Sequence, residues 1–145
     1  MVKKERFKLI PEVYLLLVRD GKILLLQRKN TGYEDGNYSL VAGHAEAGEP
    51  LTHAMVREAK EECGIKIKPG DLALSLVMHR KTDRDQAGFF FRPLKWEGDV
   101  QNLEPEKCED LNWFPIDNLP ENTIPYIRKA VESLVSGVNY CEFGW

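Results

Sequence analysis

Two nearly continuous apolar segments dominate the first part of the chain. Residues 13–18 are Val-Tyr-Leu-Leu-Leu-Val, and residues 22–28 are Lys-Ile-Leu-Leu-Leu-Gln-Arg. The Arg19-Asp20-Gly21 connection contains an Asp-Gly pair, which is typical of a tight hairpin between two strands. Because neither segment alternates with polar residues, both predict strands that are covered by side chains on their two faces.

Shorter segments predict the remaining elements. We expect a polar loop over residues 29–37 and further strands over 38–42, 72–80, 86–94 and 110–115. A helix is predicted over residues 50–63, since Pro50 suits a first helical turn and Gly64 is a typical stop. A second helix is predicted over residues 123–136, with apolar residues at helical spacing and Gly137 after it. This order predicts an α+β fold with a mixed sheet and helices packed on it.

Composition changes this picture little. The chain has 145 residues, 43% of them apolar, and a net charge of −3, so we expect one globular domain over residues 1–145. The charge balance gives no general attraction to nucleic acid, and no apolar run approaches the roughly 20 residues of a membrane span. Three widely spaced cysteines and the lack of a predicted signal segment favour a cytoplasmic location. The apolar residues 140–145 are expected to pack on the domain or to form a homodimer contact.

The first predicted helix concentrates carboxylates on one flank. With Arg57 at zero and about 100° per residue, Glu61, Glu58 and Glu62 fall within an arc of roughly 100°. Like charges at these spacings repel, so the cluster costs stability unless a cation lies beside it. A solvated acidic face is the alternative interpretation. A hard divalent cation such as Mg²⁺, which prefers carboxylate oxygens and phosphates, would relieve the repulsion. The apolar residues of the helix lie on the opposite flank and predict its buried face: Met55, Val56, Ala59 and Cys63.

Residues 43–65 follow the spacing G-x5-E-x7-R-E-U-x-E-E-x-G-U, in which U is a bulky apolar residue. The fixed positions are occupied by Gly43, Glu49, Arg57, Glu58, Glu61, Glu62, Gly64 and Ile65, with Ala59 at the first U. The segment closely resembles the Nudix box of the Nudix (MutT-like) hydrolases. Ala59 is smaller than usual there, and Val41-Ala42 replaces a Pro-Gly that many members have before the box. Neither departure removes a carboxylate.

The resemblance implies an α/β/α sandwich and hydrolysis of a nucleoside diphosphate linked to another group X, with Mg²⁺ or Mn²⁺. By position in the box, Glu61, Glu62 and the backbone carbonyl of Gly43 would be metal ligands. Glu58 would be either a ligand or the general base, while Arg57 and Glu49 would orient the site. The catalytic set implied by the box is Glu58, Glu61, Glu62 and Arg57. A further ligand often comes from an acidic loop outside the box, here Glu104, Glu106 or Glu109, of which Glu106 is our candidate.

Residues outside the box are the candidates for contacts with the substrate. Arg28 and His79 end predicted strands and are candidates for phosphate contacts, and Tyr38 or Tyr33 is a candidate for stacking on a base. Each of these residues also has an ordinary surface or packing role as the alternative.

Three functions are compatible with the box. A nucleoside triphosphate pyrophosphohydrolase of the MutT type is the first hypothesis. ADP-ribose or another nucleotide sugar is the second, although the proline expected about fifteen residues beyond the box in that subgroup is missing from residues 78–81. Signatures of the NADH and coenzyme A types are also missing. A non-catalytic nucleotide sensor is the third, and the retained glutamates disfavour it. The expected partner is a small nucleotide, with no nucleic acid and no membrane.

Overall fold

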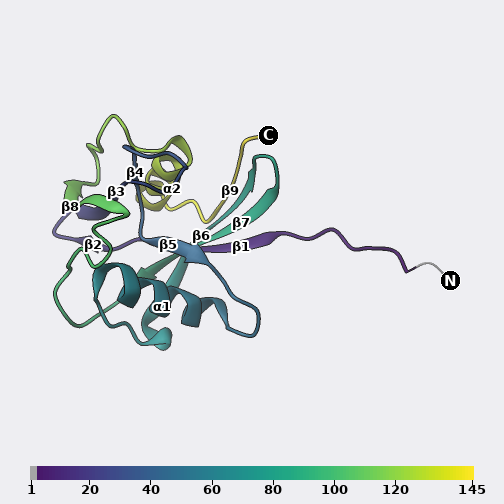
Figure 1. The fold of residues 1–145 in the computed structure, drawn as a ribbon, viewed down its shortest axis with the longest axis horizontal. Helices are drawn as coiled ribbons and strands as arrows, with labels where there is room; N and C mark the ends of the chain where they lie inside the picture. The colour runs from purple at the N-terminus through teal and green to yellow at the C-terminus, as the bar shows by residue number, and fades with distance from the viewer. Residues whose placement is uncertain (1–2) are drawn as a thin grey trace.

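The computed structural model describes residues 3–145 as two β-sheets between two helices (Figure 1). The strands are β1 (Ile10–Leu15), β2 (Val18–Arg19), β3 (Lys22–Arg28), β4 (Tyr38–Ser39), β5 (Ala42–His44), β6 (Leu72–Lys81), β7 (Asp85–Pro93), β8 (Cys108–Pro115) and β9 (Tyr140–Phe143). The helices are α1 (Leu51–Cys63), α2 (Pro125–Ser136) and the short 3₁₀ turn η1 (Pro69–Asp71). The predicted α+β fold with a mixed sheet is confirmed. Within the described residues, no helix has the length and apolar character that a bilayer crossing requires.

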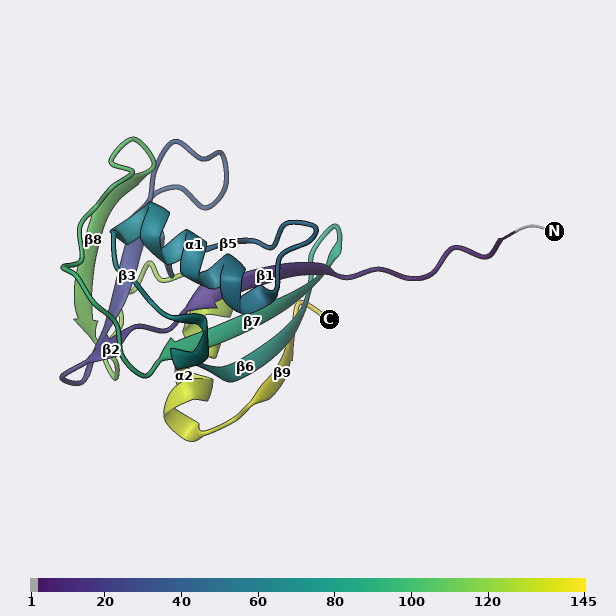
Figure 2. The same cartoon turned by 90° about the horizontal axis from the view of Figure 1, so that it is seen from below.

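The larger sheet has the strand order β5-β1-β7-β6-β9. It is mixed, because β1 runs parallel to β7 and β6 runs parallel to β9, whereas the β1–β5 and β6–β7 pairs are antiparallel. In the second sheet, β3 pairs with β2, β4 and β8. Helix α1 packs on β1 and β5, and α2 packs on β6 from the other side (Figures 1 and 2).

Strand β1 contributes to a separate apolar cluster on each of its faces. Val13 and Leu15 belong to the cluster beneath α1, while Tyr14 and Leu16, the residue after the strand, belong to the cluster beneath α2. Strand β3 alternates in the same way. Successive side chains of a strand point to opposite faces, so an unbroken apolar run is what a sheet between two helices requires. The prediction that both segments are covered on two faces is confirmed.

The predicted hairpin has the expected turn, but most of its predicted first strand belongs to the other sheet. The Asp20-Gly21 turn joins β2 to β3, and both residues have positive φ, +53° and +73°, as such turns require. However, β1 ends at Leu15 and pairs with β5 and β7 in the other sheet. The chain changes sheet between Leu16, whose N–H donates to Phe91 O at 2.8 Å, and Leu17, whose carbonyl accepts from Leu24 N at 3.0 Å.

The predicted strand 38–42 is divided in the same manner. Its first part forms β4 in the second sheet, and its last residue begins β5 in the first sheet. The intervening Leu40 and Val41 are both buried, one in each apolar cluster. This second crossing brings Gly43 beside Glu58 of α1.

The predicted helices and C-terminal segment are found with small shifts. Helix α1 begins at Leu51, directly after Pro50, and ends at Cys63; the following Gly64 has a φ of +77°, the left-handed conformation typical of a helix stop. Helix α2 begins at Pro125 rather than 123. The C-terminal residues pack on the domain as expected, but as a parallel strand, β9, that the sequence did not predict.

Candidate active site

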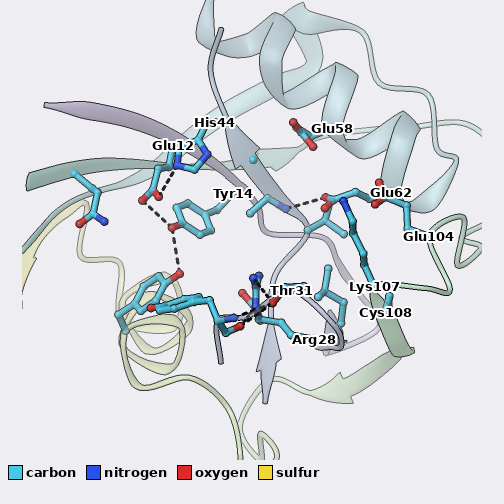
Figure 3. Close-up of a pocket in the computed structure, with 18 of the residues that line it drawn as sticks. Glu12, Tyr14, Arg28, Thr31, His44, Glu58, Glu62, Glu104, Lys107 and Cys108 are labelled. Atoms are coloured by element: carbon cyan, nitrogen blue, oxygen red, sulfur yellow. Dashed lines mark hydrogen bonds and ion pairs between the residues drawn. The ribbon is translucent and has the colours of Figure 1, made fainter. Parts of the chain in front are cut away.

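A cavity of about 880 Å³ lies between α1 and the loop that follows β3. Glu58 and Glu62 line it from α1, and Arg28 and Thr31 line it from the opposite side (Figure 3). Glu61 of α1 also belongs to the lining. Glu12, Tyr14 and His44 lie at one end, and Glu104, Lys107 and Cys108 lie at the other (Figure 3). Acidic and basic side chains therefore face each other across one depression of the surface.

Glu62 is held at the wall of the cavity by a backbone donor. The N–H of Ala42 in β5 donates a 3.0 Å hydrogen bond to Oε2 of Glu62. The pKa of Glu62 is raised to about 9, mainly by burial and also by the neighbouring carboxylates of Glu58 and Glu104, whereas the hydrogen bond from Ala42 lowers it. Burial also raises the pKa of Glu58, although the Arg57 guanidinium opposes the shift. A positive charge between these carboxylates would stabilise both.

Arg57 connects the loop before α1 to the helix. Its guanidinium lies 2.7 Å from Glu49 Oε1, 2.8 Å from Glu58 Oε1 and 3.6 Å from Glu61 Oε2. Its Nη2 also donates to the carbonyl of His44 at 3.3 Å. The hydrogen bond from Arg57 lowers the pKa of Glu49, so this carboxylate is ionised and fully paired. The arrangement fixes the approach of the loop to the helix and the direction of the Glu58 side chain.

Gly43 permits the close packing of β5 against α1. A Cβ atom built on Gly43 would overlap the carboxyl group of Glu58. Any side chain at this position would therefore displace Glu58, and only glycine leaves its carboxylate beside the strand. The Gly43 backbone and the Glu58 carboxylate thus share one small space on the cavity wall.

The carboxylates on the cavity wall are suitable ligands for a hard cation, although their oxygen atoms do not converge on a single point. Among residues 3–145, no three His, Cys, Asp or Glu side chains converge closely enough to form a complete metal site. The reason is visible in the contacts, since Arg57 holds Glu58 and lies near Glu61, while Glu62 bonds to Ala42. Carboxylate oxygens, a nearby backbone carbonyl and mutual repulsion are nevertheless the chemistry that Mg²⁺ satisfies.

Comparison with known proteins identifies the family. The family model described as the NUDIX domain matches residues 8–134. The chain belongs to the Nudix family. The NAD-capped RNA hydrolase NudC of Shigella dysenteriae is 30% identical over 92% of this Nudix chain, and the NudC of Stutzerimonas stutzeri is 32% identical over 78% of it. These alignments cover 51% and 39% of the two relatives, so the chain spans about half the length, or less, of the curated relatives it matches.

Solved structures agree with the Nudix assignment. The crystal structure of a MutT NUDIX hydrolase from Burkholderia pseudomallei has a TM-score of 0.78 and 29% identity, covering 86% of this chain and 97% of that one. The MutT protein of Methanosarcina mazei, at 23% identity and a TM-score of 0.76, covers 92% of this chain and 97% of its own. The second likeness shows the shared fold alone.

The structure brings some of the predicted site residues of the Nudix chain together and leaves others outside the cavity. Gly43, Glu58, Glu61, Glu62 and Arg28 line the cavity, and Arg57 and Glu49 lie directly behind it. The remaining three candidates, Tyr38, His79 and Glu106, do not line it.

Each of the three candidates outside the cavity has other contacts. Tyr38 donates from its hydroxyl to Asp110 at 2.7 Å, and the His79 ring packs on Trp145. The Glu106 carbonyl accepts a hydrogen bond from Asn30, and the acidic residue of this segment that lines the cavity is Glu104.

Sequence reasoning missed a buried polar group at the far end of the cavity. Glu12 and Arg80 are 8% and 6% exposed, and their side chains lie 3.3 Å apart. The Tyr14 hydroxyl donates to Glu12 at 3.0 Å, and the Arg80 guanidinium lies 3.9 Å from the ring centroid of Tyr126. The only signal in the sequence was a charged residue, Glu12, at the start of a strand buried on both faces. Its partner Arg80 comes from β6, and the Tyr126 ring beside Arg80 comes from α2, elements that local patterns do not connect to β1.

Proposed function

We propose that this Nudix domain hydrolyses a pyrophosphate bond in a nucleoside diphosphate linked to another group X. The observation that carries the proposal is the pair of partly buried carboxylates, Glu58 and Glu62, facing Arg28 across one cavity. Phosphoryl transfer asks a protein mainly for positioning and charge neutralisation, and an acidic wall opposite basic side chains supplies both once a divalent cation is present.

The residues that would hold Mg²⁺ or Mn²⁺ are Glu58, Glu61, Glu62 and the Gly43 carbonyl, with Glu104 as an additional carboxylate in place of Glu106. When bound, such a cation neutralises phosphate charge and lowers the pKa of a water molecule. Arg57 and Glu49 keep Glu58 directed along the helix. Arg57 lies within 4.0 Å of four carboxylates in the described part of the chain, so it balances the acidic cluster while the cation is absent.

Arg28 and Lys107 are suited to bind the phosphate groups. Both line the cavity, and neither lies within 4.0 Å of a carboxylate in the described residues. Arg28 is oriented by hydrogen bonds from Nε to the Tyr33 carbonyl, at 2.7 Å, and from Nη2 to the Thr31 hydroxyl, at 3.0 Å. A guanidinium whose direction is already fixed loses little conformational entropy when it binds an anion.

A nucleoside triphosphate is the first substrate class we propose, in keeping with the likeness to the Burkholderia MutT protein over nearly its whole length. The second is a dinucleotide of the NAD type, free or at the end of an RNA, because the NudC relatives are named for NAD-capped RNA. The sequence suggested no nucleic-acid partner, but the proposed substrates now include an RNA that carries such a cap. ADP-ribose stays as an alternative substrate, and a nucleotide sensor without activity stays as the non-enzymatic alternative.

A substrate panel tests the proposal. The purified chain is incubated with the common nucleoside triphosphates, ADP-ribose, NAD and a short NAD-capped RNA, with Mg²⁺ or with excess chelator, and products are separated by chromatography. We expect Mg²⁺-dependent release of a nucleoside monophosphate from at least one class. Turnover that is equal in chelator contradicts the metal assignment, and binding without turnover of any member favours the sensor.

A further inference from the structure

Tyr33 presents an aromatic ring to the cavity without a structural role in either core. It belongs to the loop between β3 and β4, lines the cavity and is 46% exposed. Neither apolar cluster includes it, and within residues 3–145 its hydroxyl has no hydrogen-bond partner. Its neighbour Thr31 lies on the side of the cavity opposite Glu58 and Glu62 (Figure 3). A large aromatic side chain left exposed inside a cavity is suited to contact a ligand.

The loop that carries Tyr33 is held in one conformation. The Asp35 carboxylate accepts hydrogen bonds from the N–H groups of Thr31, at 3.1 Å, and Gly32, at 2.9 Å. Asn30 and Glu34 have positive φ values of +53° and +51°, a region that asparagine tolerates and that glutamate rarely adopts. The Tyr33 carbonyl accepts from Arg28 Nε. The backbone that carries the ring is therefore positioned before any ligand arrives, which reduces the entropy lost on binding.

The surroundings of the ring favour a planar partner. The Arg28 guanidinium lies 5.4 Å from the ring centroid of Tyr33. Arg80 and Tyr126 form a stack of a cation on a ring that lines the same cavity. Flat aromatic and guanidinium surfaces around one depression are what a nucleobase or another flat heterocycle contacts by stacking.

We propose that Tyr33 is the residue on which the heterocyclic base of the substrate stacks, at the opposite side of the cavity from the carboxylates of the box. The assignment rests on the proposed function for the identity of the ligand as a nucleotide. It replaces Tyr38, whose ring packs edge-on against Phe114 and whose hydroxyl bonds to Asp110. Stacking tolerates many bases because each has a π-face, so Tyr33 contributes affinity for a base without selecting one.

Binding measurements with and without a base test this role. Calorimetric dissociation constants are measured for AMP and for ribose 5-phosphate, which lacks the base, with wild type, Tyr33→Ala and Tyr33→Phe. We expect Tyr33→Ala to weaken AMP binding about tenfold or more and to leave ribose 5-phosphate unchanged, while Tyr33→Phe keeps the wild-type affinity. Tyr140→Ala is the matched control, because Tyr140 is a comparably exposed tyrosine on β9 outside the cavity.

The outcomes separate this proposal from the proposed hydrolysis. AMP binding that depends on Tyr33 supports stacking even if no substrate is turned over. Conversely, a nucleotide can be turned over while its monophosphate binds equally well to wild type and Tyr33→Ala. That result overturns the stacking role and leaves the hydrolase proposal intact. An equal loss for AMP and ribose 5-phosphate overturns it as well, since the ring would then act on the loop rather than on the base. The stacking role is also overturned if the wild-type protein binds AMP no more tightly than ribose 5-phosphate, because the base would then add no affinity.

Discussion

The backbone N–H of Ala42 donates a 3.0 Å hydrogen bond to the side chain of Glu62. The two residues come from β5 and α1, so the bond joins the strand in which the box begins to the helix that carries its carboxylates. It holds Glu62 in a position where burial raises the pKa to about 9. The strand and the helix thus keep a carboxylate where its charge is unfavourable, a cost to folding that a bound cation would offset.

Glu62→Gln should stabilise the metal-free protein. The amide oxygen still accepts the hydrogen bond from Ala42, and the substitution removes a carboxyl group that folding keeps protonated at pH values above its ordinary pKa of 4.5, which costs stability. We expect the melting temperature in chelator at slightly alkaline pH to rise by roughly 3–6 °C, equivalent to about 1 kcal/mol or more. Circular dichroism melts measure it, with the exposed Glu121→Gln as control. A lower melting temperature for Glu62→Gln contradicts the charge argument.

Gly43→Ala should damage the site more than the fold. The new methyl group overlaps the Glu58 carboxyl group, so the side chain must turn away from the strand. We expect turnover to fall at least tenfold and stability to fall by about 1–3 kcal/mol. Gly70→Ala is the control, since nothing lies within 4 Å of a Cβ at that position and its backbone is not left-handed. If Gly43→Ala turns over substrate as fast as wild type, the assignment of Gly43 and Glu58 to the active site is wrong.

Arg57 and Glu49 should act as one unit. Their side chains are joined by two hydrogen bonds, 2.7 and 3.3 Å long, and Arg57 also pairs with Glu58. Arg57→Lys and Glu49→Gln should each lower turnover about tenfold or more, because lysine lacks the planar fork and glutamine lacks the charge. The double variant should lose little beyond the worse single variant. Additive losses in a double-mutant cycle of turnover would show that the two residues act independently.

Tyr38 should contribute stability that disappears at high pH. Burial and the hydrogen bond to Asp110 raise the pKa of Tyr38 to about 12 from an ordinary value of 10.0. The unfolded chain therefore loses this proton first, so the contribution is complete below pH 10 and is lost as the pH rises toward 12. Urea unfolding of wild type and Tyr38→Phe measures it. The stability gap, about 1 kcal/mol at neutral pH, should narrow above pH 10, and a gap that is constant with pH would contradict the assigned pKa.

The helix of the box could be predicted because its determinants are local. Gly64 stops α1, and the carboxylates share one flank because their spacing matches the helical repeat. The choice between Tyr33 and Tyr38 could not be made in this way. The two lie five positions apart, and which of them lines the cavity depends on the Asp35 hydrogen bonds and on Asp110 from a distant strand.

The two sheets are a second feature that local patterns did not predict. Residues 13–18 are apolar throughout, so either sheet can accept any of them, and the sequence predicts one strand. The division after Leu15 is decided by pairing with Phe91 and Val41, which lie far away along the chain. The Glu12–Arg80 pair depends on the same long-range register, since β1 reaches β6 only through β7.

The central claim is that the glutamates of the box hold a catalytic cation. The most direct test measures the turnover of the best substrate, and the rise in melting temperature on adding Mg²⁺, for wild type, Glu61→Gln and Glu62→Gln. We predict that wild type is stabilised by Mg²⁺, and that both variants stay folded, respond less to Mg²⁺ and lose turnover by about a hundredfold or more. Variants that turn over substrate like wild type and melt with an unchanged response to Mg²⁺ would contradict the claim, because the glutamates would then form only a solvated face.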